Sequence, residues 1–302
     1  ILDLAHPLFD TITGGTVKDI DFKRVNMVYP DSQAGDTIAT IAARLKNKGV
    51  IENVNVQGYL EGRDHIAGLV NNIEGQSRVE NVSFKGRIKS KGGNSVTAGI
   101  AGTNAMSLVK RAYVEADIWV KSGQNAGMLV AQNFTDYSGS GWGNWGRLMQ
   151  SVAKGKLEDA GSRNAAGIAA SIWPYGTIND TVSYATVVNG KELFSSDNEI
   201  TDAWMGQKLQ NLFGVQGHSS GTKIGKDAKF RRLTEAEAEQ KVKSYRITAL
   251  EETSANEVTT EKLNAAILRT STYQDKPGYK AENEQLYQNL ERFMPFYNQE
   301  FL

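Results

Sequence analysis

The sequence predicts a mainly β protein: a right-handed parallel β-helix, a solenoid of coils about 30 residues long, followed by a small α-helical domain. Three observations predict this fold class. A two-part phrase recurs along the chain, its longer part alternates apolar and polar residues, and no proline occurs in residues 31–173. Repetition at a fixed period is typical of stacked supersecondary units, and strands within hydrogen-bonded ladders exclude proline.

The shorter part of the phrase is Ala-Gly followed by Ile, Leu or Met. Its clearest copy is Ala67-Gly68-Leu69. Further copies are Ala98-Gly99-Ile100, Ala126-Gly127-Met128 and Ala166-Gly167-Ile168. The spacing of the copies is too short for strand–helix–strand units, and no helical pattern separates them. Each copy therefore marks one coil of a solenoid.

The longer part of the phrase reads V-x-N-V-x-[FV]-x-G-x-[IL]. The clearest copy spans residues 79–88, and looser copies span residues 51–60, 109–118 and 148–157. Alternation with a period of two is the signature of a strand with one buried face. A small residue recurs at one inward position, where we expect a narrow interior: Gly58, Gly86, Ala116 and Gly155.

A polar residue stands just before the long strand in most copies. These residues are Asp19, Asn53, Asn81 and Gln150. Because Asn and Asp tolerate turn geometry and bond to nearby backbone, the pattern predicts a stacked ladder at a corner of the coil. Arg111 occupies the same place in the copy at residues 109–118 and is expected to interrupt the ladder.

We expect three regions along the chain. The β-helix occupies residues 1–190, and residues 191–230 form a cap or connection, because the open end of a solenoid needs a cover. Residues 231–302 are expected to form an α-helical domain. Thr234 and Glu237 make a capping box that opens a helix towards Tyr245, and residues 260–268 and 281–293 also read as helices.

Composition excludes several classes of function. The 34 basic and 34 acidic residues balance, so there is no electrostatic case for nucleic acid or an acidic membrane surface. No apolar run approaches the length of a membrane span. The absence of cysteine excludes disulfides, a thiol nucleophile and cysteine metal ligands. The chain opens at Ile1 without a signal peptide and stops in mid-pattern, so we expect it to be a piece of something longer.

No catalytic or metal-binding motif is found in the sequence. The three histidines, His6, His65 and His218, neither begin an H-E-x-x-H motif nor share metal-ligand spacing. A P-loop and a serine nucleophile elbow are also missing. We therefore expect no cofactor in this chain itself.

The outward residues of the aligned coils form two columns in which the sign of charge alternates. The columns are Gln57, Lys85, Glu115, Lys154 and Tyr59, Arg87, Asp117, Lys156. A glycosidase needs two carboxylates that converge within about 5–10 Å, and a calcium-dependent lyase needs an acid cluster. Because each carboxylate here is interleaved with cations, we expect a solvated surface rather than an active site.

One lengthened loop carries four aromatic residues among four glycines. They are Phe134, Tyr137, Trp142 and Trp145. Long loops on rigid scaffolds often carry function, and exposed Trp and Tyr are favoured contact residues, so these four are candidate partner-binding residues. The alternative is a buried local cluster on the side of the solenoid, which is the commoner fate of aromatic residues.

The Ala-Gly element and the V-x-N-V strand together resemble GLUG-type repeats, which occur in the immunoglobulin A protease family of streptococcal-type zinc metallopeptidases. Residues 286–298, LYQNLERFMPFYN, are similar to the segment that follows the β-helix in those enzymes, ahead of their catalytic domain. The family's H-E-x-x-H motif is absent from this sequence, so no catalytic residue is carried over. Zinc would belong to the catalytic domain of the parent protein.

The resemblance implies an extracellular protein, secreted or held at the bacterial cell surface. It also implies that this chain is a non-catalytic scaffold that presents its own catalytic domain and helps to hold host immunoglobulin A or a related glycoprotein. Two alternatives stay open. One is an adhesin-like β-helix module that binds a host protein or glycan; the other, which the charge columns disfavour, is a carbohydrate-active enzyme.

Overall fold

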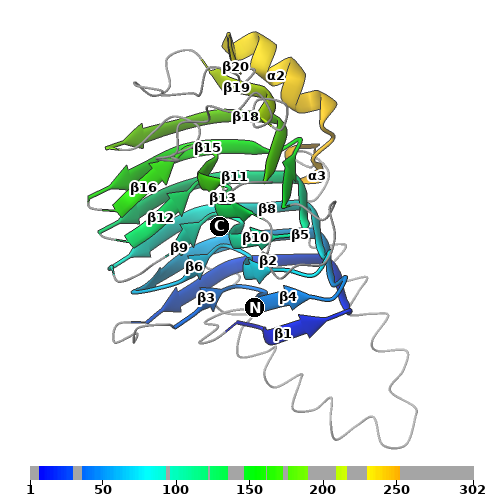
Figure 1. Cartoon of the computed structure of the whole chain (residues 1–302), viewed down its shortest axis with the longest axis vertical. Helices are drawn as coiled ribbons and strands as arrows, with labels where there is room; N and C mark the ends of the chain where they lie inside the picture. Colours follow the sequence, from blue (N-terminus) through cyan, green and yellow to red (C-terminus); the bar gives the residue numbers. More distant parts are fainter. Residues whose placement is uncertain are drawn as a thin grey trace, which may run out of the picture. The chain divides into compact units, whose positions relative to one another are not determined.

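The chain folds as a parallel β-solenoid, which confirms the predicted mainly β class. The structure is a computed structural model that describes residues 7–29, 36–92, 96–121, 123–134, 146–160, 162–172, 176–189, 209–215 and 230–251. All of these lie in one compact unit, Ile1–Glu251. Three sheets run along the stack, the strand pairs of the described residues are parallel, and the coils make about five turns (Figure 1).

The strands of successive turns stack into three sheets, and one turn supplies both β14 and β15 to the longest of them. The long sheet contains β2 (Thr16–Val28), β5 (Val50–Gly62), β8 (Arg78–Ser90), β11 (Leu108–Val120), β14 (Arg147–Met149), β15 (Val152–Asp159), β18 (Thr177–Val188), β19 (Leu209–Val215) and β20 (Phe230–Leu233). The second contains β1 (Phe9–Thr13), β4 (Ala42–Lys46), β7 (Val70–Ile73), β10 (Ala101–Ala105), β13 (Val130–Phe134) and β17 (Ala169–Ile172). The third contains β3 (Ile38–Ala39), β6 (Ile66–Ala67), β9 (Val96–Ala98), β12 (Gly123–Gly127) and β16 (Ser162–Ala166).

The Ala-Gly phrase lies at the turn between the third and second sheets. A Cβ atom added to Gly68 would lie 2.0 Å from the Gly99 carbonyl oxygen and 2.6 Å from Cγ of Phe84. The next coil and an interior side chain of the long strand therefore fill the space where a side chain would go. Phe84 is fully buried, so the glycine permits a large residue in the core.

The small residues of the long strands stack in one column, as predicted, but the expected reason was incomplete. Ala116 is buried in the core, whereas Gly86 has φ of +144°. A Cβ atom on Gly86 would lie 1.9 Å from the Gly58 carbonyl oxygen. The backbone of the neighbouring coil, rather than a narrow interior, excludes a side chain at Gly86.

The polar corner ladder is present and extends beyond the predicted members. Residues Asp19, Asn53, Asn81, Arg111, Gln150, Asp180 and Asn211 all have φ between 47° and 57°. Asn53 Nδ2 donates to Asp19 Oδ1 at 2.9 Å, and Asn81 Nδ2 donates to Asn53 Oδ1 at 2.6 Å. Arg111 keeps the left-handed backbone while its guanidinium bonds Glu80 at 2.8 Å. It therefore interrupts the side-chain ladder without changing the corner.

The predicted capping box is confirmed at the start of α2 (Glu235–Ser244). The Glu237 backbone N–H donates to Thr234 Oγ1 at 3.3 Å, and the Thr234 backbone N–H donates to Glu237 Oε2 at 2.8 Å. Tyr245 is the C-cap, where the sequence places the end of the helix. A short helix, α3 (Thr248–Glu251), follows. The helices predicted at residues 260–268 and 281–293 lie outside the described residues.

The segment containing α2 and α3 packs on an apolar stretch of the long sheet (Figure 1). Tyr113, Val152 and Val182 are opposite one another on neighbouring strands, and they form a buried cluster with Tyr245 and Ile247. This apolar column would otherwise face solvent.

Polar contacts fix that segment at the junction of α2 and α3. Tyr245 Oη donates to Asp180 Oδ1 at 3.1 Å, and the Thr248 backbone N–H donates to Asn81 Oδ1 at 2.9 Å. Two members of the corner ladder therefore anchor the helical segment to the solenoid. No helix in the described part of the chain has the length and apolar character needed to cross a membrane.

Candidate functional site

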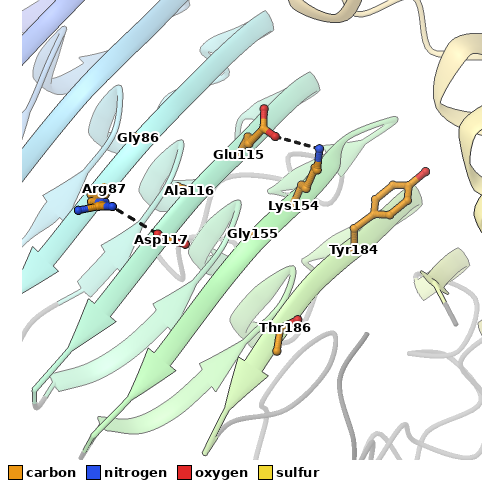
Figure 2. Close-up of a pocket in the computed structure, with 9 residues that line it drawn as sticks. All are labelled: Gly86, Arg87, Glu115, Ala116, Asp117, Lys154, Gly155, Tyr184 and Thr186. Atoms are coloured by element: carbon orange, nitrogen blue, oxygen red, sulfur yellow. Dashed lines mark ion pairs between the residues drawn. The ribbon is translucent and has the colours of Figure 1, made fainter. Parts of the chain in front are cut away.

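The outward face of the long sheet contains a shallow, open groove of about 490 Å³. Strands β8, β11, β15 and β18 supply the residues that line it: Gly86, Arg87, Glu115, Ala116, Asp117, Lys154, Gly155, Tyr184 and Thr186. In Figure 2 the labelled side chains project from successive strands in two rows, and the small residues lie between the rows. We call this feature the outer groove.

Strand register creates the outer groove. Ala116 lies opposite Gly86 on one side and Gly155 on the other, so three small residues are adjacent. Residues on either side of them in each strand point outward and form the rows. The register confirms the two charge columns predicted from the sequence and adds Tyr184 to the first and Thr186 to the second.

The first row contains an ion pair between Glu115 and Lys154, with 2.9 Å between Oε1 and Nζ (Figure 2). Tyr113 Oη also donates to Glu115 Oε2 at 2.9 Å. Burial alone would raise the pKa of Glu115, but the hydrogen bonds from Lys154 and Tyr113 outweigh it and hold the pKa below its usual range. Glu115 is therefore ionised at neutral pH.

The second row contains a more exposed ion pair between Arg87 Nε and Asp117 Oδ2, 3.8 Å apart (Figure 2). The two side chains are 75% and 63% exposed. Solvent screens such a pair, so its contribution to stability is small. Both groups are accessible to a molecule in the outer groove.

Tyr184 and Thr186, on β18, complete the lining. The Tyr184 ring packs against the apolar cluster beneath α2. Burial, followed by the charges of Glu239 and Glu235 on α2, raises the pKa of Tyr184 to about 12. The phenol therefore stays neutral and keeps its hydroxyl proton through the physiological pH range.

The outer groove offers hydrogen-bond donors and acceptors, and its carboxylates are paired with cations. Both lining carboxylates, Glu115 and Asp117, pair with cations, whereas a glycosidase acid requires a raised pKa. Within the described residues, no group of three or more His, Asp or Glu side chains could hold a metal ion. This arrangement does not match that of a carbohydrate-active enzyme.

The candidate aromatic residues fall at the edge of the described chain. Phe134 ends β13, and its side chain is not described. Tyr137, Trp142 and Trp145 lie outside the described residues. Partner binding by this loop therefore stays a prediction. The outer groove was missed as a site at the sequence level, although the columns that form its rows were predicted.

Fold and site together define a β-solenoid with an ion-paired outer face. Comparison with known proteins shows which family this chain resembles. Residues 1–58 match the family model described as M26 IgA1-specific Metallo-endopeptidase N-terminal region. The resemblance predicted from the repeats is confirmed: over its whole length the chain is related to the immunoglobulin A protease family of zinc metallopeptidases.

Individual proteins are similar to this chain over the same length. Zinc metalloprotease ZmpB of Streptococcus pneumoniae is 36% identical across 100% of this chain, and ZmpC of that species is 29% identical across 100%. An Immunoglobulin A1 protease of Streptococcus sanguinis is 26% identical across 99%. The aligned region covers only 16%, 15% and 16% of those proteins, respectively. The chain therefore spans about one sixth of the length of these relatives.

Proposed function

We propose that this chain is a non-catalytic scaffold region of a longer zinc metallopeptidase, and that it helps to position a host glycoprotein substrate. The single observation that carries the proposal is the whole-length similarity to proteins named as zinc metalloproteases and immunoglobulin A1 proteases. The ion-paired outer face and the rigid stack of coils suit a surface that holds another molecule.

The proposal includes the parts that the parent family implies. The catalytic zinc and its ligands belong to a separate domain, which is one partner of this chain, and host immunoglobulin A or a related glycoprotein is the other. The protein acts outside the bacterial cell, secreted or at the surface. The division into a right-handed β-helix at residues 1–190, a connection at 191–230 and a helical domain at 231–302 is part of the same proposal.

A deletion in the parent protease tests the positioning role. The parent and a variant lacking the region that corresponds to this chain are assayed on intact immunoglobulin A1 and on a short peptide that spans the cleaved bond. We expect kcat/KM to fall about tenfold or more on the intact protein and to stay unchanged on the peptide. Equal activity of both enzymes on the intact protein would contradict the proposal.

A competition assay covers the case in which the deletion damages the catalytic domain. An excess of the purified chain is added to the unmodified parent. The chain should slow cleavage of intact immunoglobulin A1 and leave cleavage of the peptide unaffected. If the chain changes neither rate, it does not hold this substrate.

The adhesin-like alternative is favoured by one sequence observation, the aromatic loop. If the loop binds a host protein or glycan, Trp142→Ala combined with Trp145→Ala should weaken binding about tenfold or more without lowering the unfolding temperature. Unchanged affinity in a pulldown with host glycoproteins would exclude the loop as the contact.

A further inference from the structure

We propose that the outer groove binds a segment of a linear, neutral oligosaccharide that lies along the stack of coils. This inference concerns a ligand site on the long sheet and does not depend on a role in proteolysis. It rests on the direction of the groove, its floor of small residues and the balanced charges of the residues that line it.

The outer groove crosses the strands, because its floor consists of residues paired between neighbouring strands. Gly86, Ala116, Gly155 and Ala185 follow one another in register. Neighbouring strands are about 4.8 Å apart, so the floor and the rows repeat with that period. This repeat is close to the length of one sugar unit in an extended chain, so successive sugars can meet equivalent positions on successive coils.

The floor is flat and presents mostly carbon. Gly86 and Gly155 have no side chain, and no larger residue can replace them without a clash, since Cβ atoms would lie 1.9 Å and 2.1 Å from backbone oxygens of the neighbouring coil. The CH face of a pyranose ring is also flat and apolar. It can therefore lie on this floor while the ring's hydroxyl groups point towards the two rows.

The residues that line the outer groove offer donors and acceptors without net charge; Lys85 and Lys156, which stand in the same two columns, are not among them. Arg87 and Lys154 provide N–H donors, and Glu115 and Asp117 provide carboxylate acceptors. Each cation already pairs with a carboxylate, so these side chains are partly ordered before a ligand arrives. Two balanced pairs favour neutral hydroxyl groups over a strongly charged ligand.

An extended peptide fits the outer groove less well. Peptides that bind sheets usually add a strand at an open edge, where backbone groups lack partners. The floor lies instead on the face of the sheet, where β8, β11, β15 and β18 already pair through their backbones. The floor also lacks a deep pocket for an anchoring side chain, which most tight peptide sites contain.

The test is a titration of the purified chain with neutral linear hexasaccharides: maltohexaose, cellohexaose and the hexamer of N-acetylglucosamine. Isothermal calorimetry should show saturable binding of at least one of them, with Kd of about 1 mM or tighter. The double variant Arg87→Ala, Asp117→Ala should weaken that binding about tenfold or more. Both side chains are largely exposed, so this variant should fold normally.

A matched control removes an ion pair of the same sheet outside the outer groove. Arg78 Nη2 and Glu52 Oε2 are 3.3 Å apart on β8 and β5, and neither residue lines the groove. The variant Arg78→Ala, Glu52→Ala should bind the hexasaccharide as the unmodified chain does. Circular dichroism of all three proteins confirms that the comparison is between folded chains.

Each other outcome overturns the inference. No binding of any hexasaccharide would show that the outer groove is not a sugar site, and binding that survives Arg87→Ala, Asp117→Ala would place the site elsewhere. Binding only of an acidic saccharide such as hexagalacturonate, or only of an uncharged Gly-Ser-Thr decapeptide, would identify a different ligand class. None of these results bears on the cleavage assays of the parent protease, so the two proposals can fail separately.

Discussion

Gly86→Ala should destabilise the solenoid strongly, because the backbone of the preceding coil occupies the space that a methyl group needs. The new Cβ atom would lie 1.9 Å from the Gly58 carbonyl oxygen and 2.9 Å from its carbonyl carbon. The residue also has φ of +144°, which alanine rarely adopts. Backbone strain costs about 1–3 kcal/mol and the forced separation of two coils about 1–3 kcal/mol.

These two contributions predict a loss of about 2–6 kcal/mol in the free energy of unfolding. The matched control is Gly15→Ala, because a Cβ atom there would lie 3.4 Å from Ile12 Cγ2, at ordinary contact distance. The control should leave stability unchanged or raise it by up to about 1 kcal/mol. Urea unfolding followed by circular dichroism measures both variants. Equal stability of Gly86→Ala and Gly15→Ala would refute the close approach of the coils.

Three further predictions follow from the packing, the helical segment and the acid groups. Phe84→Ala should lower the free energy of unfolding by about 3–5 kcal/mol in the same urea assay, since the ring is fully buried; a loss below about 1 kcal/mol would contradict its place in the core. Tyr245→Phe removes the hydrogen bond to Asp180 and should cost about 0.5–1.5 kcal/mol, with faster amide exchange in α2 than in β8; uniform exchange rates would argue against local anchoring. The hydrogen bond from Lys91 holds the pKa of Glu61 below its usual 4.5. The ionised Glu61 therefore contributes to the free energy of unfolding above pH 4.5, and this contribution is lost as the pH falls through the lowered pKa. Glu61→Gln should flatten the acid side of the profile of stability against pH, and an unchanged profile would exclude this linkage.

The long strands could be predicted residue by residue because two constraints act together. Alternation fixes which side chains face the core, and stacking without gaps from β5 to β18 then leaves a single register; only the pair β2–β5 among these strands contains a register shift. Lys85 lies opposite Glu115, and Glu115 lies opposite Lys154, as the aligned repeats indicate. The corner ladder could also be predicted, because few residue types tolerate a left-handed backbone.

Features that depend on the approach of separate coils could not be predicted. Alternation alone gives no reason for Gly86 to have positive φ, and it does not show that a helical segment covers the outward residues Tyr113 and Val152. Buried polar residues were also missed. Asn104 Nδ2 donates to Asn133 Oδ1 at 2.8 Å inside the stack, where a hydrophobic pattern predicts apolar residues.

The outer groove also has a part that could be predicted from the sequence and a part that could not. Its rows follow from the repeat, so their charges were predicted as columns. Its floor depends on how the small residues lie between those rows. Tyr184 and Thr186 can be assigned to the rows only when β18 is placed in register with β15. A sequence alignment of the last coil to the earlier ones is the signal that could have identified both residues.

Disulfide formation between introduced cysteines tests the in-register stack most directly, because the chain has no cysteine of its own. Lys85→Cys with Glu115→Cys places the two residues on adjacent strands about 4.8 Å apart, within the range for a disulfide. Lys85→Cys with Lys154→Cys places them two coils apart, about 10 Å and beyond that range. Under mild oxidation the first pair should crosslink within the monomer and the second should stay reduced. Crosslinking of the second pair, or failure of the first in folded protein, would contradict the solenoid register on which the outer groove depends.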